Sequence, residues 1–248
     1  FAERVLDMRP RSKPDPRRLK RVRVIAHRGV HDNRRVLENT LPAFQAASEA
    51  RVWGIEFDIR WSADHVPVVF HDADLVRLAG SPARIGDLTA GRLRVVHSWI
   101  PTLQEVLERF GTHLHLMMEL KEDPCGHGRI EVLAERLTAL TAGRDFHLMS
   151  FDTALLDQMS FLPAAALLPI AGWDVRTSSR WALDRGCGGL SASQILLSRR
   201  HISRHHRAGQ RIGTGFVDSK NVLYREAARG VDWVFSNRAG DLVRWQKS

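Results

Sequence analysis

Acidic and apolar residues alternate in residues 54–60, which read Gly-Ile-Glu-Phe-Asp-Ile-Arg. Successive side chains of a β-strand point to opposite faces, so Glu56 and Asp58 share one face and the apolar residues share the other. In a barrel the apolar face packs against helices and the carboxylates face the axis. Two buried like charges repel and lose hydration, so they require a compensating cation. A solvent-facing edge strand with two ordinary acids explains the segment equally well when it is taken alone.

A third acid, Glu119, shares one strand face with Lys121 in the apolar segment 113–121. With Glu56 and Asp58 it makes a set of three carboxylates, the hard oxygen donors that suit Mg²⁺ or Ca²⁺. Lys121 is then a candidate ligand for a phosphate group. Taken singly, a Glu119–Lys121 ion pair at the end of a strand is the plainer interpretation.

Two histidines, His27 and His71, each directly follow a predicted strand. At the carboxyl ends of parallel strands both would reach the active face of a barrel. Two imidazoles on either side of a phosphodiester can serve as base and acid, because their pKa lies near neutrality. Arg28 can bind two phosphate oxygens, and Gly29 allows the backbone to turn close to a ligand. A hydrogen-bonded structural histidine is the alternative for either one.

The elements that must position these residues alternate between strands and helices. Thr102 and Glu105 predict a capping box at the start of one helix. Such alternation implies parallel strands with helical crossovers and favours a closed (β/α)8 TIM barrel, with a small irregular excursion around residues 74–100. Strands are predicted at 22–26, 54–60, 66–70, 113–120, 146–151, 165–170, 188–191, 211–217 and 232–236, and helices at 40–50, 102–110, 130–140, 153–159 and 221–229.

The chain length of 248 residues fits one barrel domain. We expect residues 1–21 to form a basic, extended lead-in, with no helix in the Arg- and Pro-rich stretch 9–23, and residues 22–248 to form a single domain. The hydrophobic fraction of 44% is that of an ordinary globular protein, and no apolar run reaches the length of a membrane span.

The net charge of +9 favours an anionic partner. A small-molecule phosphate ester and peripheral binding to a membrane surface both fit. Nucleic acid is not expected as a partner, because the basic residues are scattered and no recognition motif is present. We expect a cytoplasmic location, with a periplasmic or membrane-associated one as the alternative because the chain starts at Phe1. Oligomeric state is not predicted.

Three further features are candidates of lower weight. Cys125 and Cys187 fit neither a zinc pattern nor a disulfide framework, so two free thiols are expected. His201 and His205 have a metal-compatible spacing, but their arginine-rich surroundings predict a solvated basic face. Trp173 follows a predicted strand and is a candidate for lining a pocket.

Taken together, the motifs resemble those of the glycerophosphodiester phosphodiesterases, within the PLC-like phosphodiesterase TIM-barrel superfamily. Order and spacing both match over residues 22–121, and the resemblance continues more weakly to Asn237. The matching motifs are His27-Arg28-Gly29, Glu38-Asn39-Thr40, Glu56-x-Asp58, His71-Asp72, Pro101-Thr102-Leu103-x-Glu105-Val106-Leu107 and Glu119-x-Lys121.

The resemblance implies a phosphoric diester hydrolase that converts glycerophosphodiesters to an alcohol and glycerol 3-phosphate, within glycerol and lipid metabolism. The glycerol 2-hydroxyl can attack the phosphorus, and the resulting cyclic phosphate is then hydrolysed. The resemblance assigns one divalent cation, Mg²⁺ or Ca²⁺, to Glu56, Asp58 and Glu119. It assigns acid–base catalysis to His27 and His71, and phosphate binding to Arg28 and Lys121.

The second half departs from the family pattern. Residues 211–218 read Arg-Ile-Gly-Thr-Gly-Phe-Val-Asp where many relatives have a Trp-Thr-Val-Asn-like segment, and the last strand ends in Ser236-Asn237 instead of Thr-Asp. These positions shape the pocket for the alcohol, so the leaving alcohol is not predicted. Two alternatives remain: a phospholipase D-like enzyme acting on lysophospholipids or sphingomyelin, and a non-catalytic barrel that binds phosphate or a membrane surface.

Overall fold

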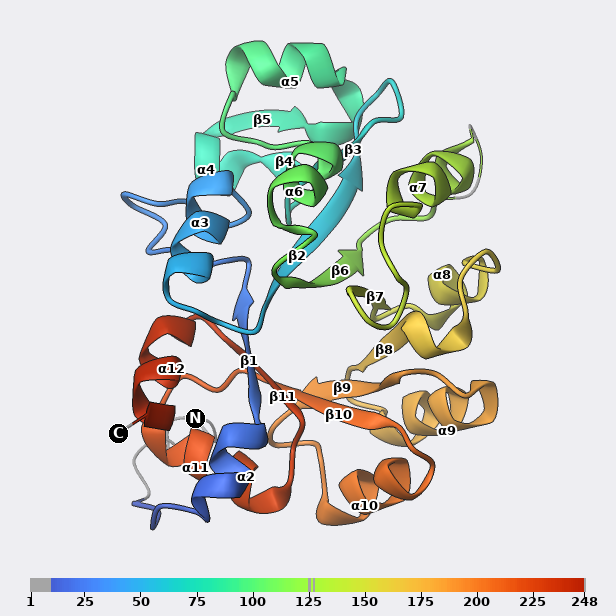
Figure 1. The fold of residues 1–248 in the computed structure, drawn as a ribbon. Helices are drawn as coiled ribbons and strands as arrows, with labels where there is room; N and C mark the ends of the chain where they lie inside the picture. The colour runs from blue at the N-terminus through green and yellow to red at the C-terminus, as the bar shows by residue number, and fades with distance from the viewer. Residues whose placement is uncertain (1–9, 125, 127, 248) are drawn as a thin grey trace.

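A closed ring of parallel strands forms the centre of the molecule. The computed structural model describes residues 10–124, 126 and 128–247. Over these residues, β1 pairs with β2 on one side and with β11 on the other, which closes a ring of eight parallel strands (Figure 1). The predicted (β/α)8 barrel is therefore confirmed. The barrel strands are β1 (Arg23–His27), β2 (Gly54–Trp61), β6 (His115–Leu120), β7 (Phe146–Ser150), β8 (Leu167–Ala171), β9 (Gly189–Ser193), β10 (Arg211–Gly215) and β11 (Trp233–Ser236).

The strand predicted at 66–70 exists but is not part of the barrel. It is β3 (Pro67–Val69), and it runs antiparallel to β2. β2 extends past the barrel rim, and the chain turns back through Ser62, whose backbone N–H donates to the Val66 carbonyl. β3 therefore returns the chain to the rim, with the Phe70 N–H donating to the Asp58 carbonyl at 3.0 Å.

Helices cover the outside of the barrel. α6 begins with the predicted capping box of Thr102 and Glu105. Besides α2, three of these helices were not predicted: α9, α10 and α12, whose sequences are rich in polar residues. The helices are α2 (Pro16–Arg21), α3 (Leu41–Glu49), α6 (Leu103–Phe110), α7 (Arg129–Leu137), α8 (Thr153–Asp157), α9 (Val175–Arg185), α10 (Arg199–Arg207), α11 (Lys220–Arg229) and α12 (Ala239–Lys247), with a short 3₁₀ turn, η2 (Ala164–Ala166), before β8. No helix in the described residues combines the length and apolar character that crossing a membrane requires.

The expectation of no helix in residues 9–23 is wrong for α2. The Asp15 carboxylate accepts from the Arg17 N–H at 2.7 Å, and Pro16 occupies the first turn, where its missing N–H is not needed. Leu19 is buried, and Arg18 donates to the Ala228 carbonyl in α11. A basic sequence thus forms a helix because one apolar residue and one cap anchor it to the barrel.

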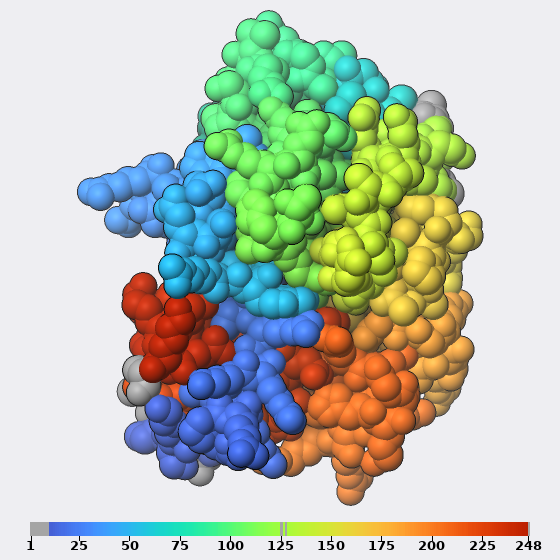
Figure 2. All heavy atoms as spheres, in the orientation of Figure 1, coloured from blue at the N-terminus to red at the C-terminus, as the bar shows by residue number. Residues whose placement is uncertain are grey.

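The excursion predicted around residues 74–100 is a small layer with its own core. It contains β4 (Asp74–Leu75), α4 (Val76–Ala79), β5 (Ser81–Arg84), a 3₁₀ turn η1 (Ile85–Asp87) and α5 (Ala90–Val96). Its buried side chains, which include Leu75 and Ile85, form a cluster separate from that of the barrel. The excursion forms the top of the molecule in Figures 1 and 2.

Two apolar layers hold the barrel together. The outward side chains of the strands pack under the helices and include Ile55, Phe57 and Ile59, as the alternation in this segment predicts. The inward layer is a second cluster of Ile25, Met117, Met149, Leu168, Trp233 and Phe235. This cluster fills the middle of the barrel. Polar side chains further along the same strands therefore lie at the carboxyl end of the barrel.

Candidate active site

Three carboxylates converge at the carboxyl end of the barrel. β2 pairs with β6 in a register that places Asp58 beside Glu119, and Glu56 precedes Asp58 on the same face. One oxygen from each of Glu56, Asp58 and Glu119 lies within 4.8 Å of the others, and all three residues are buried. The sequence prediction that these side chains share one site is consistent with this geometry.

Burial and mutual repulsion affect the pKa values of the three acids differently. Burial, together with Asp58 and Glu119, raises the pKa of Glu56 well above its ordinary value. Burial and Asp58 also raise the pKa of Glu119. For Asp58, burial is outweighed by Lys121 and Arg28, so its pKa is lowered. Its buried Oδ1 atom lies 3.0 Å from the Lys121 ammonium. A hard divalent cation fits this donor set.

Two cations, Lys121 and Arg28, lie against the carboxylates. The Lys121 ammonium is 3.0 Å from Asp58 and 2.5 Å from Glu119. Arg28 donates to Glu38 at 2.8 Å, and its Nε is 3.2 Å from Asp58. Both side chains also line the pocket. They can therefore bind a phosphate while remaining oriented by the acids behind them.

His27 is held by a chain of hydrogen bonds from the end of β11. Its Nδ1 lies 2.8 Å from the Asn237 side-chain oxygen, which can only accept, so Nδ1 carries the proton. Asp218 accepts from the Asn237 backbone N–H at 2.9 Å and side-chain N–H at 3.3 Å. The free Nε2 lies 3.8 Å from Glu56. Burial, followed by Arg28, lowers the pKa of His27 to about 4.

His71 reaches the pocket by a route that the sequence did not predict. It follows the antiparallel strand β3, so it is not at the end of a parallel strand as expected. The hairpin nevertheless brings it back to the rim, where Arg60 donates to its carbonyl at 2.7 Å. Its Nδ1 lies 2.6 Å from the Asp72 carboxylate. Burial lowers the pKa of His71, and Asp58 and Asp72 oppose that effect.

A network links His71 to the phosphate-binding candidate Arg28. Arg77 donates to Asp72 at 2.7 Å and to Glu38 at 2.6 Å. Glu38 also accepts from Arg28, so the motif residue Glu38 connects the two sides of the pocket. Burial raises the pKa of Glu38, but Arg77, Asn33 and Arg28 outweigh it and hold the carboxylate ionised.

Two other motif residues have structural tasks. Asn39 donates to Asp58 at 2.7 Å and fixes its orientation. Gly29 was expected to let the backbone turn close to a ligand, and its φ of +86° forms such a turn, which also packs closely against α3. A Cβ at this position would lie 2.7 Å from the Ala43 Cβ. Contact with this helix therefore also requires a glycine here.

One pocket of about 540 Å³ collects the predicted residues. Six of them line it, and Asp58 lies behind them in contact with Arg28 and Lys121. Trp173, a candidate from its position after a strand, lines the same pocket. The structure thus brings all the predicted site residues together, while their individual roles stay predictions. The six lining residues are His27, Arg28, Glu56, His71, Glu119 and Lys121.

The other sequence candidates lie away from this pocket. His205 is fully buried, 2.8 Å from Ser179 and 2.6 Å from Gln210, so the predicted solvated face is wrong for this residue. His201 caps the start of α10 through Ser198. Within the described residues, no metal-compatible cluster includes either histidine. Cys187 is a buried free thiol as expected, and Cys125 lies outside the described residues.

Comparison with known proteins agrees with this geometry. The sequence model of the glycerophosphoryl diester phosphodiesterase family matches residues 27–241. The chain belongs to this family. It is accordingly an enzyme of the phosphoric diester hydrolase class. The family match begins at His27 and contains every predicted site residue.

Individual relatives agree over different lengths. The Bacillus subtilis protein YhdW, named as a glycerophosphodiester phosphodiesterase, is 32% identical over 237 residues, which cover 89% of this chain and 96% of that protein. Bovine glycerophosphodiester phosphodiesterase 1 is 34% identical over 116 residues, which cover 41% of this chain and 34% of that protein.

Solved structures extend the likeness to the whole barrel. A glycerophosphodiester phosphodiesterase from Thermotoga maritima superposes with a TM-score of 0.77 at 26% identity, covering 90% of this chain and 97% of that one. An Oleispira antarctica phosphodiesterase, solved in complex with its product sn-glycerol-3-phosphate, has a TM-score of 0.77 at 25% identity and covers 91% of this chain and 97% of that one.

Sequence reasoning did not assign roles to Asp72 and Arg77. It placed Asp218 and Asn237 among the positions that shape the pocket for the alcohol, whereas in the structure they hold His27. Asp72 was visible as the neighbour of His71, and a carboxylate beside a catalytic histidine is a usable signal. Arg77 lies in the excursion, where the sequence shows no regular pattern. Asp218 and Asn237 contact the site only because the last strands close the barrel.

Proposed function

We propose that the enzyme hydrolyses glycerophosphodiesters to an alcohol and glycerol 3-phosphate, with one bound divalent cation and two-histidine acid–base catalysis. The observation that carries this proposal is the convergence of three buried carboxylates, two histidines and two cationic side chains on one pocket. Membership of the family supports it, as does the product bound to the Oleispira antarctica relative.

Glu56, Asp58 and Glu119 would hold the cation. The raised pKa of Glu56 and of Glu119 and the convergence of the three buried carboxylates support a bound cation. Oxygen ligands suit Mg²⁺ and Ca²⁺ alike. When bound, such an ion polarises a phosphate oxygen and lowers the pKa of a coordinated hydroxyl. Arg28 and Lys121 would bind the remaining charge of the phosphate.

The hydrogen-bond partners of the two histidines suggest different roles. His27 donates from Nδ1 to a neutral amide, so Nε2 presents a lone pair and suits the base. His71 has a carboxylate partner, Asp72, which stabilises an imidazolium and suits the acid. His27 would take the proton of the glycerol 2-hydroxyl as its oxygen bonds to phosphorus. His71 would protonate the departing alcohol oxygen as its P–O bond breaks.

A second step completes the hydrolysis. Water adds to the cyclic phosphate, and the bond between phosphorus and the 2-oxygen breaks, which leaves glycerol 3-phosphate. The histidines exchange roles in this step: His71 accepts the proton of the water and His27 returns one to the 2-oxygen. The enzyme is thereby restored to its starting protonation state.

The test measures release of glycerol 3-phosphate from glycerophosphocholine, glycerophosphoethanolamine and glycerophosphoglycerol. We expect a chelator to abolish turnover and Mg²⁺ or Ca²⁺ to restore it. Either His27→Ala or His71→Ala should lower kcat by about 10²–10⁴-fold. A nitrophenyl phosphodiester, with a good leaving group, should rescue His71→Ala and not His27→Ala.

Cation binding has an independent readout in thermal unfolding. The added cation should raise the Tm of the wild type, because it binds the folded state alone, and Asp58→Asn should remove that increase. Near-normal turnover in both histidine variants would contradict the mechanism. An unchanged Tm on adding either cation would contradict the metal site.

A further inference from the structure

The pocket has two chemically different halves. Its charged lining residues all come from β1, β2, β6 and the turn after β3. The opposite wall, from β7 to β11, contributes apolar side chains such as Met149, Ile170 and Leu196. Among the described residues of this wall, Ser191 and Ser193 are the polar side chains that line the pocket, and neither carries a charge. The charged half can bind a phosphate and glycerol hydroxyls, and the other half requires a different chemical group.

The apolar wall continues onto the rim through four successive strand ends. Phe151 follows β7, Trp173 follows β8, Ile195 follows β9 and Phe216 follows β10, each within two residues of the strand. Their exposed fractions are 60%, 94%, 45% and 42%. Single exposed apolar residues are ordinary, but these four line one pocket mouth on neighbouring strands. Contiguous apolar surface of this kind indicates binding of an apolar partner.

The wall is better suited to an aliphatic chain than to a polar alcohol. A choline or ethanolamine cation is recognised by carboxylates or by the faces of a closed aromatic cage. No carboxylate lines this wall within the described residues. Its inner part is aliphatic at Met149 and Ile170, and aromatic side chains join Ile195 toward the rim. A pocket of about 540 Å³ also exceeds what glycerol and phosphate occupy.

We propose that the preferred substrate is a phosphodiester carrying one unbranched aliphatic chain, which lies along the β7–β10 wall and leaves the pocket beside Trp173. This inference rests on the proposed function, because it assigns phosphate and glycerol to the charged half. The chain can be part of the alcohol that is released, or it can be an acyl group on the glycerol of a lysophospholipid. Both sources present the same chemistry to the wall.

The test compares kcat/KM for matched diesters, all below their micelle-forming concentrations. Glycerophosphoethanol, glycerophosphohexanol and glycerophosphodecanol place the chain on the alcohol, with glycerol 3-phosphate as the measured product. Decanoyl lysophosphatidylcholine places it on the glycerol, with choline as the measured product. We expect kcat/KM to rise by about fourfold for each methylene that leaves water. The arm that shows the gain identifies which side of the diester carries the chain.

Variants of the rim locate the chain. Trp173→Ser and Ile195→Ser should each lower the ratio of kcat/KM between the decyl and ethyl diesters by about tenfold, the effect of losing one apolar contact. Val95→Ser is the matched control, because Val95 is 75% exposed on α5 and does not line the pocket. That control should leave the ratio unchanged.

A binding measurement distinguishes failure of this inference from failure of the proposed function. The same series is titrated into His71→Ala, and affinity should increase with chain length whether or not catalysis occurs. Absence of turnover on every diester, with affinity still rising, would contradict the proposed function and support the apolar subsite. Turnover that is independent of chain length, or highest on glycerophosphocholine, would overturn the subsite and leave the proposed function intact.

Discussion

At the scale of single residues, the partner of His27 is the feature that distinguishes the two histidines. An amide accepts from His27, whereas a carboxylate accepts from His71. Asn237 is itself fixed by Asp218, which also accepts from the Ser236 hydroxyl at 2.8 Å. The imidazole of His27 is therefore oriented by side chains that contact neither the carboxylates nor the phosphate-binding residues.

Asn237→Ala tests whether this orientation matters for catalysis. Loss of the acceptor frees the His27 ring to rotate and to change tautomer, so kcat should fall by about 10–100-fold with KM little changed. The same substitution in a His27→Ala background should have almost no further effect, because Asn237 acts through His27. A full additional loss in the double variant would show that Asn237 contacts the substrate directly.

The site residues found from the sequence lie in short motifs between residues 27 and 121. In these motifs the residue types and their spacing predict a site even when the fold is unknown. Glu56 and Asp58, for example, share one face of their strand wherever that strand lies in the fold. Asn237 belongs to no such short motif, because the residue it contacts, His27, is 210 positions away in the sequence. The contact of Gly29 with Ala43 was not predicted for a related reason, since a glycine indicates a positive φ but not the neighbour that lies against it.

At the scale of elements, the turn from β1 into α3 sets the position of two site residues. His27 ends β1, and Arg28 and Gly29 follow with φ of +56° and +86°. The Gly29 N–H donates to Ala26, and the Val30 N–H donates to Ala43 in α3. The site is thereby tied to the packing of a helix, and a change at the turn should affect stability and activity together.

Gly29→Ala should destabilise the protein by about 2–4 kcal/mol, since it adds strain at positive φ and a clash with Ala43. It should also lower kcat, because the turn carries His27 and Arg28. Gly80→Ala is the matched control: Gly80 has a φ of +65° but nothing lies within 4 Å of an added Cβ. Its cost should be about 1 kcal/mol, measured by urea unfolding. Equal losses in the two variants would show that contact with α3 contributes nothing.

Helices and strands were predicted correctly where the apolar periodicity is strong. They were missed or misplaced where tertiary packing determines the secondary structure. β2 and α6 were located because their buried faces are regular. The strand at 66–70 was predicted, but its antiparallel direction was not, because direction depends on a hairpin that sequence periodicity does not encode. α9 was not predicted, since its buried positions include Ser179 and few large apolar residues. The helical α2 depends on one buried leucine contacting a neighbour that is distant in sequence.

At the scale of the whole molecule, the amino end of the barrel is closed by aromatic residues and histidines. Trp53 stacks on His115 at a centroid distance of 4.2 Å, and His147 meets Trp233 edge-on at 5.1 Å. His115 Nε2 lies 2.8 Å from His147 Nδ1, and its own Nδ1 lies 2.9 Å from the Arg144 carbonyl.

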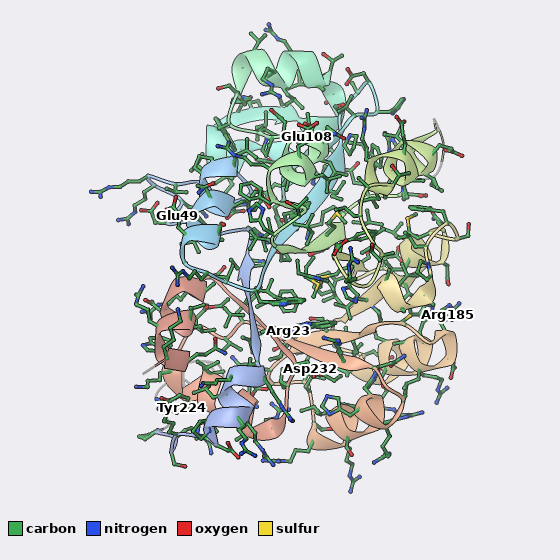
Figure 3. The ribbon with its side chains drawn as sticks, in the orientation of Figure 1. Arg23, Glu49, Glu108, Arg185, Tyr224 and Asp232 are labelled. Carbon is green, nitrogen blue, oxygen red and sulfur yellow. The ribbon has the colours of Figure 1, made fainter. Side chains whose placement is uncertain are left out.

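Fixed charges surround this layer. Arg23 lies over Trp53, and Arg211 lies over Trp233. Asp232 adjoins Arg23, whose backbone N–H donates to the Asp232 carbonyl at 2.9 Å (Figure 3). Asp145 adds a weaker opposing effect on His115. The histidines must therefore stay neutral in the folded protein.

The protein should lose stability as pH falls below about 6.5. Burial, with the nearby arginines, lowers the pKa of His115 to about 4. Burial, with His115 and the arginines, lowers that of His147 to about 3. The unfolded chain takes up these protons near pH 6.5 and the folded chain does not, so the free energy of unfolding falls as pH drops to about 4. Each histidine contributes a slope of about 1.4 kcal/mol per pH unit.

Urea unfolding of His147→Gln across this range isolates the effect. The free energy of unfolding of this variant should depend on pH less steeply than that of the wild type, by the equivalent of about one proton. His113→Gln, which removes an exposed histidine, is the control and should keep the wild-type slope. Parallel curves for the wild type and His147→Gln would show that this layer does not limit acid stability.

The pairing of the first barrel strand with the last has a consequence for synthesis of the protein. A growing chain leaves the ribosome amino end first, so β1 emerges long before β11, its partner in the closed ring. Until then β1 has an open edge, and His27 lacks the amide that orients it. All seven predicted site residues therefore leave the ribosome before the strand that completes the ring. The barrel closes, and His27 gains its amide partner, only when that last strand is in place.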